Sequence, residues 1–167
     1  MDLRICRDAF SSFINRIGYT KVEGMIDVSL LEHTVRECLK ETAPRICAIF
    51  DPVKLVITNY EGNGETITAE NIDGHPELGT REMQFARELY IERGDFLKQA
   101  DKNFFRLSPG GREVRLKSAY IIQATGCDKD ANGNITTVYA TYDPASKSGT
   151  EGGNRKTKAT INWVECN

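Results

Sequence analysis

The stretch that decides the fold is "REVRLKSAYIIQATGCDKDANGNITTVYATYD", residues 112–143. Apolar and polar residues alternate in its first part, and β-branched or aromatic residues resume after the polar centre "DKDANGN". The Asn-Gly pair in this centre is a strong hairpin signal, because both residues tolerate positive φ. The stretch therefore predicts two antiparallel strands joined by a turn at residues 128–134.

The same polar centre has the spacing of a calcium loop. Oxygen ligands occupy its odd positions and glycine the sixth (Asp128, Asp130, Asn132, Gly133 and Asn134). An EF-hand also needs flanking helices and a bidentate glutamate at the twelfth position, which here is Tyr139. We interpret the segment as a turn and keep a calcium module as an alternative, which a thermal shift with calcium would test.

Further strand-like runs lie on both sides of this hairpin, at residues 45–60, 83–93 and 156–164. No long helical pattern alternates with them, so the sequence favours an antiparallel sheet or barrel over a parallel one. Residues 146–154, "SKSGTEGGN", have the composition of a flexible loop.

The N-terminal part of the chain shows a helical period instead. Apolar residues recur at helix spacing in residues 5–17 and 31–39. Gly18 and Pro44 predict the ends of these helices, and Ser29 predicts a capping box at the start of the second. Two short helices are therefore expected before a mainly β domain.

Composition indicates the class of protein. Hydrophobic residues make up 40% of the 167 residues, which is enough for a packed core. No apolar run approaches the roughly 20 residues that a membrane span requires. The five cysteines are scattered and never spaced as CxxC, which favours reduced thiols and argues against structural zinc. We expect a cytoplasmic protein with no membrane partner.

Charge is distributed unevenly along the chain. The net charge is −2, but basic residues gather at 98–117 and again at 155–158, whereas 51–97 is acidic. A basic stripe on an acidic body predicts a localised anionic ligand, although a solvated surface of mixed charge gives the same pattern. Phe104 and Phe105 stand among these charges, and exposed aromatic rings can stack on unpaired bases.

The strand within 112–122 orients part of this stripe. Because residues i and i+2 of a strand share a face, Val114 and Leu116 are expected to point into the core. Arg115 and Lys117 are then expected to project together from the other face, and arginine can bind base edges with two hydrogen bonds.

No catalytic constellation is apparent. The two histidines, His33 and His75, lack a nucleophile motif nearby. No phosphate loop, dinucleotide fingerprint or H-E-x-x-H sequence is present. The sequence therefore predicts neither a catalytic residue nor a metal site.

Several long stretches resemble the glutaminyl-tRNA synthetase family, and they appear in that family's order over most of the chain. They are "APRICAIFDPVKLVITNY" (43–60), "GHPELGTRE" (74–82), "REVRLKSAYII" (112–122), "DKDANGNITTVYATYDP" (128–144) and "KATINWV" (158–164). The family's HIGH-like and KMSKS-like catalytic signatures do not occur.

The resemblance implies a mainly β fold with a short α-helical N-terminal part. Residues 1–45 would end a helical subdomain with two helices. Residues 46–167 would form the proximal antiparallel anticodon-binding β-barrel, of a type shared with a ribosomal protein. This barrel would be incomplete, because its partners, the distal barrel and the catalytic domain of the same parent chain, are absent.

The resemblance also implies how the work of the parent enzyme is divided. The parent would ligate glutamine to tRNA(Gln) with ATP and Mg²⁺, and these cofactors would serve the catalytic domain. The present chain would need no cofactor, would contact the anticodon loop of tRNA(Gln), and would catalyse nothing alone.

Six residues match positions that contact the anticodon loop in this family: Lys21, Arg45, Asn103, Arg106, Arg115 and Lys117. By this resemblance Arg45 would read the middle base, Arg106 the third, and Arg115 with Lys117 the first. Lys21 would lie near the loop, and Asn103 stands where glutamine is frequent. Lys117 replaces a usual arginine and lacks its planar fork, which weakens the expectation of first-base selection. Phe105 stands where a basic residue is common.

Two other readings stay open. An archaeal or eukaryotic-type glutamyl-tRNA synthetase shares this barrel architecture. A stand-alone β-barrel interaction module without an RNA role would show no salt-dependent affinity for tRNA.

Overall fold

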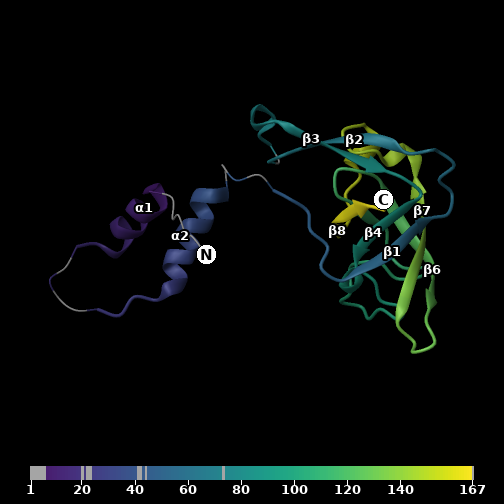
Figure 1. Cartoon of the computed structure of the whole chain (residues 1–167), viewed down its shortest axis with the longest axis horizontal. Coiled ribbons are helices and arrows are strands. Elements are labelled where there is room, and N and C mark those ends of the chain that lie inside the picture. The colour runs from purple at the N-terminus through teal and green to yellow at the C-terminus, as the bar shows by residue number, and fades with distance from the viewer. Residues whose placement is uncertain are drawn as a thin grey trace. The chain divides into compact units, whose positions relative to one another are not determined.

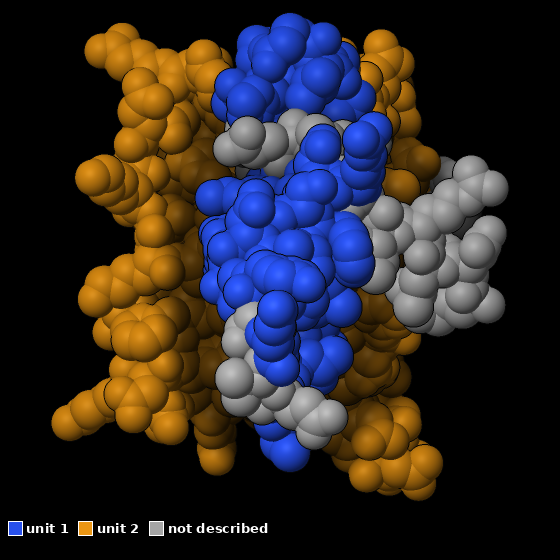
Figure 2. Space-filling view, turned by 90° about the vertical axis from the view of Figure 1, so that its left-hand side faces the viewer, with its two compact units in different colours: residues 1–45, 71–79 blue, residues 46–70, 80–167 orange. Residues whose placement is uncertain are grey.

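The computed structural model describes residues 7–19, 21, 24–40, 43, 45–72 and 74–166. The chain divides into two compact units, drawn in different colours in Figure 2. The first unit comprises residues 1–45 and 71–79, and the second comprises residues 46–70 and 80–167. The first carries the α-helices and the second carries the sheets.

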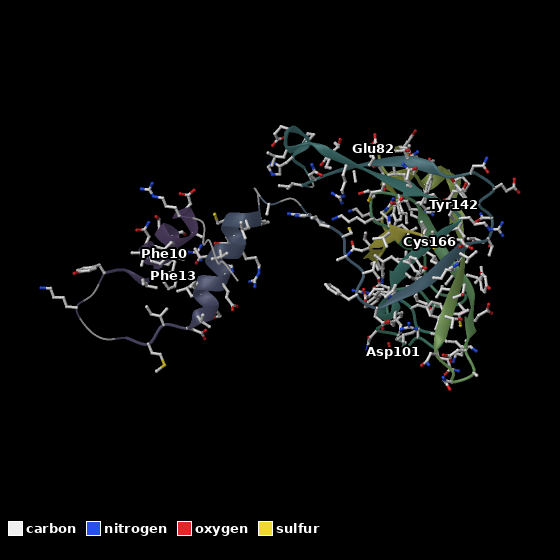
Figure 3. All side chains as sticks on the ribbon, in the orientation of Figure 1. Phe10, Phe13, Glu82, Asp101, Tyr142 and Cys166 are labelled. Atoms are coloured by element: carbon white, nitrogen blue, oxygen red, sulfur yellow. The ribbon has the colours of Figure 1, made fainter. Side chains whose placement is uncertain are left out.

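The first unit contains the two helices that the sequence predicts, α1 (Arg7–Ile17) and α2 (Val28–Lys40), together with the short 3-10 helix η1 (Pro76–Leu78) (Figure 1). Phe10 and Phe13 lie next to each other on α1, with ring centroids 6.5 Å apart (Figure 3). Neither α-helix described is long and apolar enough to cross a membrane.

The helix ends follow from local hydrogen bonding. Gly18 ends α1 with φ of +72°, and its amide donates to the Ile14 carbonyl at 3.0 Å. The predicted capping box at Ser29 is wrong, because Ser29 already lies inside α2. The Asp27 carboxylate accepts from the Ser29 amide at 2.8 Å and thereby satisfies a first-turn donor. The predicted end at Pro44 lies outside the described residues.

The described residues of the second unit form nine strands. They are β1 (Pro52–Ile57), β2 (Glu65–Glu70), β3 (Thr80–Phe85), β4 (Glu88–Glu92), β5 (Val114–Leu116), β6 (Ile121–Lys129), β7 (Ile135–Asp143), β8 (Thr160–Ile161) and β9 (Trp163–Glu165). Seven of them form one sheet in the order β8-β5-β6-β7-β1-β4-β9, and β2 pairs with β3 separately. Short 3-10 turns are η2 (Arg93–Asp95), η3 (Pro144–Ser146) and η4 (Gly152–Asn154).

The seven-stranded sheet curls into a nearly closed barrel (Figure 1). Its two edge strands, β8 and β9, are separated in sequence by Asn162 alone, so the chain passes directly from one edge to the other. The Trp163 indole on β9 donates to the carbonyl of Lys117, which directly follows β5, at 2.9 Å and so links one edge strand to the end of the strand beside the other. The prediction of a mainly β barrel preceded by two helices is confirmed.

The barrel is not wholly antiparallel as predicted. β1 runs parallel to β7, with Lys54 opposite Thr137, and β5 runs parallel to β8, with Arg115 opposite Thr160. The other pairs are antiparallel. Alternation of apolar and polar residues shows which side chains face the core, but it does not show which strand pairs with which. These two parallel pairings therefore could not be predicted from the sequence.

The hairpin predicted at residues 128–134 is confirmed, since β6 and β7 pair along their length on either side of it. Gly133 has φ of +86°, and its amide donates to the Asp130 carbonyl at 3.0 Å. The Asp130 carboxylate accepts from the amides of Asn132 and Asn134 and from the Asn134 side chain, at 2.8–3.0 Å. Both carboxylate oxygens of Asp130 are therefore occupied by the turn itself.

Other strand boundaries differ from the prediction. β2 was not predicted, because the segment Glu65–Glu70 buries only Ile67 and Ala69 and is otherwise polar. The single run predicted at 83–93 is divided between β3 and β4, and the run at 156–164 is divided at Asn162. Residues 45–51 precede β1 without strand structure.

Aromatic rings form a cluster in the core of the second unit. Phe85 lies with its ring centroid 5.6 Å from that of Trp163 and 5.1 Å from that of Tyr120. Tyr142 on β7 (labelled in Figure 3) meets Tyr120 edge-to-face, with ring centroids 5.1 Å apart. Such pairs contribute about 0.5–1.5 kcal/mol beyond their buried area. The aromatic cluster therefore ties β3, β7 and β9 to the segment before β6.

Candidate nucleic-acid interface

The parallel pairing of β5 with β8 brings the two basic segments of the sequence together. Arg115 lies opposite Thr160, and its amide donates to the Ala159 carbonyl at 3.1 Å. Because the two strands run in the same direction, the residues that precede them emerge at the same end. Arg112 and Lys158, far apart in sequence, therefore become neighbours.

A tight turn, "SPGG" at residues 108–111, delivers Arg112 to this surface. The Gly111 amide donates to the Ser108 carbonyl at 2.9 Å, and Gly110 adopts φ of +64°. A Cβ atom on Gly111 would lie 2.1 Å from Ser108 Oγ and 2.9 Å from the Ser108 carbonyl oxygen. The turn thus requires glycine and fixes the direction in which Arg112 leaves.

Phe105 lies close to both Arg112 and Lys158. Its ring is 40% exposed, whereas Phe104 is half-buried. The Arg112 guanidinium carbon lies 5.0 Å from the centroid of the Phe105 ring, and the Lys158 ammonium lies 5.5 Å from it. Both distances lie within the range of cation–π attraction. The structure thus places an accessible aromatic ring next to two cations.

A hollow of about 270 Å³ adjoins this ring, lined by Arg112, Glu113, Lys156, Thr157 and Lys158. The one carboxylate in its lining, that of Glu113, pairs with Arg155 at 3.2 Å. Within the part of the chain that the structure describes, no carboxylate pairs with the three cations of the lining. The hollow is therefore positively charged and suited to an anion. We call Phe105, Arg112, Lys156 and Lys158 the Phe105 surface.

Arg106 is held by an ion pair with a buried carboxylate, that of Asp95. Its guanidinium forms an ion pair with Asp95, whose side chain is only 4% exposed, while the Arg106 side chain is 53% exposed. The Asp95 carbonyl also accepts from the Leu107 amide at 3.0 Å. This pairing holds one side of the guanidinium in place and leaves the rest of it at the surface.

The Arg115 side chain forms hydrogen bonds within the protein. Its guanidinium donates to four acceptors in the loop after β7: the carbonyls of Ser146, Gly153 and Arg155 and the hydroxyl of Ser148, at 2.7–3.3 Å. Burial lowers the pKa of Arg115, and the nearby charge of Arg155 lowers it further. Arg115 therefore clamps the loop that leads into Lys156 and Lys158.

Lys117 and Asn103 are the other predicted contact residues of the second unit. β5 ends at Leu116, and Lys117 enters a tight turn in which Ser118 has φ of +60°. Lys117 is half-buried, and Val114 and Leu116 are buried, as predicted. Asn103 is exposed, and its amide donates to the Asp101 carboxylate at 2.9 Å.

Lys21 and Arg45 belong to the first unit, and both are exposed. The Arg45 amide donates to the Asn71 carbonyl at 3.1 Å, and its guanidinium donates to the Lys40 carbonyl at 3.3 Å. These bonds hold Arg45 between the end of α2 and the segment 71–79.

The structure adds residues that the sequence-based assignment left out. Arg112, Lys156 and Lys158 were visible in the sequence only as members of two basic clusters. Their shared position depends on the β5–β8 pairing, for which the sequence carries no separate signal. The sign that the sequence offered was the presence of two basic clusters, at 98–117 and 155–158, within one predicted β-domain.

The described residues hold few other groups of chemical interest. His75 pairs with Glu77 at 2.9 Å and His33 with Glu37 at 3.4 Å, both at the surface. Among the described residues, no group of three or more His, Cys, Asp or Glu side chains is arranged to hold a metal ion.

Comparison with known proteins links the chain to one family of tRNA synthetases. Residues 43–143 match the family described as "tRNA synthetases class I (E and Q), anti-codon binding domain". The chain is 48% identical to a glutamine–tRNA ligase of Clostridium perfringens over 157 residues, or 93% of the chain. Glutamine–tRNA ligases of Escherichia coli and Shigella boydii are 47% identical over 154 residues, or 92% of the chain. The chain spans 28% of the length of each of these relatives.

Proposed function

The chain belongs to the anticodon-binding domain family of the class I tRNA synthetases for glutamate and glutamine, and on this premise we propose that it binds the anticodon loop of tRNA(Gln). It would do so as part of a cytoplasmic glutamine–tRNA ligase. The catalytic domain of that parent chain would use ATP and Mg²⁺ to ligate glutamine to the tRNA. The distal barrel would be the second neighbour within the same parent chain.

The observation that carries this proposal is the gathering of cations around an exposed aromatic ring in the Phe105 surface. Cations supply phosphate contacts, which give affinity and position, while base-edge contacts give selectivity. Single-stranded RNA is recognised where unstacked bases meet aromatic rings and arginine planes. An anticodon loop offers both phosphates and unpaired bases.

The base assignments remain part of the proposal. Arg45 would read the middle base, and Arg106, anchored by Asp95, would read the third. For the first base, Arg115 would have to exchange one of its loop acceptors for a base edge, with Lys117 beside it. Lys21 and Asn103 would contact the loop from exposed positions.

The family description includes glutamate enzymes as well as glutamine enzymes. Identities of 47–48% to glutamine–tRNA ligases favour the glutamine enzyme for this chain. We expect the chain alone to show no aminoacylation, because the catalytic signatures of the family do not occur in it.

The testing experiment measures binding of the chain to two anticodon stem-loops at several salt concentrations. One stem-loop carries the glutamine anticodon CUG, and the other carries CAG, changed at the middle base only. We expect CUG to bind about tenfold more tightly, in line with the roughly 1–3 kcal/mol of a good base contact. The variant Arg45→Ala should lose this preference.

Arg36→Ala is the matched control, because Arg36 is an exposed arginine on α2 with no assigned base. It removes the same charge from the same unit and should keep the preference. Equal binding of CUG and CAG by the unaltered chain would contradict the anticodon assignment. Absence of binding to either stem-loop by a folded sample would favour an interaction module without an RNA role.

A further inference from the structure

We propose that the Phe105 surface is a nucleotide subsite: Phe105 stacks on one unpaired base, and the adjoining hollow holds that nucleotide's phosphate. This inference rests on the proposed function and assigns to it four residues, Phe105, Arg112, Lys156 and Lys158. In this subsite the ring and the cations act on different parts of one ligand.

The environment of the ring supports the stacking role. A phenylalanine in a barrel loop would gain most by burial, yet Phe105 remains 40% exposed while Leu107, two residues on, is fully buried. Its contacts with Arg112 and Lys158 are cation–π contacts, which are weak at an exposed site. A base can therefore replace one cation at the ring without a large loss.

The displaced cation has a better partner close by. The Lys158 ammonium sits on a flexible four-carbon stem and lines the hollow as well as approaching the ring. A phosphate in the hollow offers Lys158 a charged acceptor, which is stronger than the aromatic ring. Arg112 can stay at the ring, because its planar guanidinium stacks on rings and bases alike.

The surrounding charges favour phosphate over other acceptors. Arg155 neutralises Glu113 at 3.2 Å and also pairs with Asp143 at 3.1 Å, so the acidic groups nearby already have partners. Arg112, Lys156 and Lys158 then leave a net positive hollow beside the ring. An acidic peptide would satisfy these charges but would leave Phe105 without a flat partner.

The experiment uses the full chain and a CUG anticodon stem-loop carrying 2-aminopurine at each loop position in turn. We expect one position to change fluorescence on binding and to lose that change in Phe105→Leu. That variant should weaken binding about tenfold without altering the salt dependence, because it removes the stacking ring and leaves every charge in place. Lys158→Gln should instead reduce the slope of log affinity against log salt by about 0.7–0.9.

Two matched controls separate the subsite from general effects. Phe50→Leu removes a phenylalanine that is 90% exposed elsewhere on the second unit and should leave affinity unchanged. Lys129→Gln removes an exposed lysine at the far end of β6 and should leave the salt slope unchanged. Circular dichroism confirms that each variant is folded.

The outcomes distinguish this inference from the proposed function. If Phe105→Leu binds like the unaltered chain while CUG is still preferred over CAG, the subsite is overturned and the anticodon proposal stands. If binding depends on Phe105 but CUG and CAG bind equally, the subsite stands and the anticodon proposal fails. A stem-loop with abasic loop positions, or a polyglutamate peptide, that binds as tightly as the CUG loop would overturn the subsite. Absence of any RNA binding would overturn both.

Discussion

The hairpin tip at residues 128–134 and the Phe105 surface both carry residues typical of ligand sites, but their polar groups are used in opposite ways. At the tip, Asp130 accepts three hydrogen bonds from Asn132 and Asn134, and these bonds lower its pKa. At the Phe105 surface, Arg112 and Lys158 rest on an aromatic ring instead of a carboxylate. The comparison shows that residue types alone do not distinguish a structural turn from a binding surface. What distinguishes them is whether the polar side chains already have hydrogen-bond or ion-pair partners within the protein.

The largest expected effect on stability and RNA affinity comes from a substitution in the turn that positions Arg112, with the four residues of the Phe105 surface unchanged. Gly111→Ala places a Cβ atom against the Ser108 carbonyl and forces the turn to shift, which should cost roughly 3 kcal/mol of unfolding free energy. RNA affinity should fall as well, because Arg112 leaves from this turn. Urea unfolding and stem-loop titration check both effects.

Gly110→Ala is the control for that change. A Cβ atom on Gly110 meets nothing within 4 Å, but its φ of +64° is unfavourable for alanine and should cost about 1–2 kcal/mol. A loss in Gly111→Ala no larger than in Gly110→Ala would show that the close approach to Ser108 is not needed.

A second prediction concerns the clamp at Arg115. Arg115→Lys keeps the charge but cannot reach four acceptors, so unfolding free energy should fall by about 2 kcal/mol. Hydrogen exchange should speed up in residues 146–155, and RNA affinity should fall because the loop leads into Lys156 and Lys158. Arg87→Lys, at an exposed arginine, should show none of these changes. Unaltered exchange in Arg115→Lys would rule out the clamp.

A third prediction concerns the Glu65 carboxylate on β2, which, like that of Asp130, already has hydrogen-bond partners. Burial alone would raise the pKa of Glu65, but hydrogen bonds from Lys147 at 2.7 Å and Tyr120 at 2.6 Å outweigh it and lower the pKa below 4.5. The stability that Glu65 contributes is therefore present above its unfolded pKa, near 4.5, and is lost as pH falls through the lower folded pKa.

The test of this linkage is the variant Glu65→Gln. It should be about 1 kcal/mol less stable than the unaltered chain at pH 7, and the difference should disappear in strong acid. Stability measured from pH 7 down to pH 2 gives the profile. A difference that stays constant over this range would mean that the carboxylate charge contributes nothing.

The smallest effect is expected at the hairpin tip. Asp130→Ala removes hydrogen bonds within an exposed turn, so the melting temperature should fall only slightly and RNA affinity should stay unchanged. Millimolar calcium should not shift the melting temperature of the unaltered chain, because both Asp130 oxygens accept hydrogen bonds within the turn and Tyr139 replaces the bidentate glutamate. A clear calcium-dependent stabilisation would restore the calcium alternative.

The sequence predicted local features well because they depend on neighbouring residues. The Asn-Gly turn, the two helices and the burial of Val114 and Leu116 all follow from short-range pattern. The parallel pairings of β1 with β7 and of β5 with β8 depend on segments far apart in sequence, for which alternation carries no information.

The candidate site was predictable to a smaller degree for the same reason. Two basic clusters and an aromatic pair could be seen in the sequence, but their convergence on Phe105 depends on the β5–β8 pairing. The engagement of Arg115 by four loop acceptors was equally hidden, since a guanidinium's partners follow from the folded loop.

The direct passage of the chain from β8 to β9 through Asn162 has a consequence for synthesis on the ribosome. Every earlier strand of the barrel can leave the exit tunnel before β8 pairs with β5 and Trp163 reaches Phe85. Pairings between such distant segments close slowly, since chain entropy is lost before contacts compensate for it. The barrel core therefore closes only after β8 and β9 have emerged, and until then its exposed strand edges are open to aggregation.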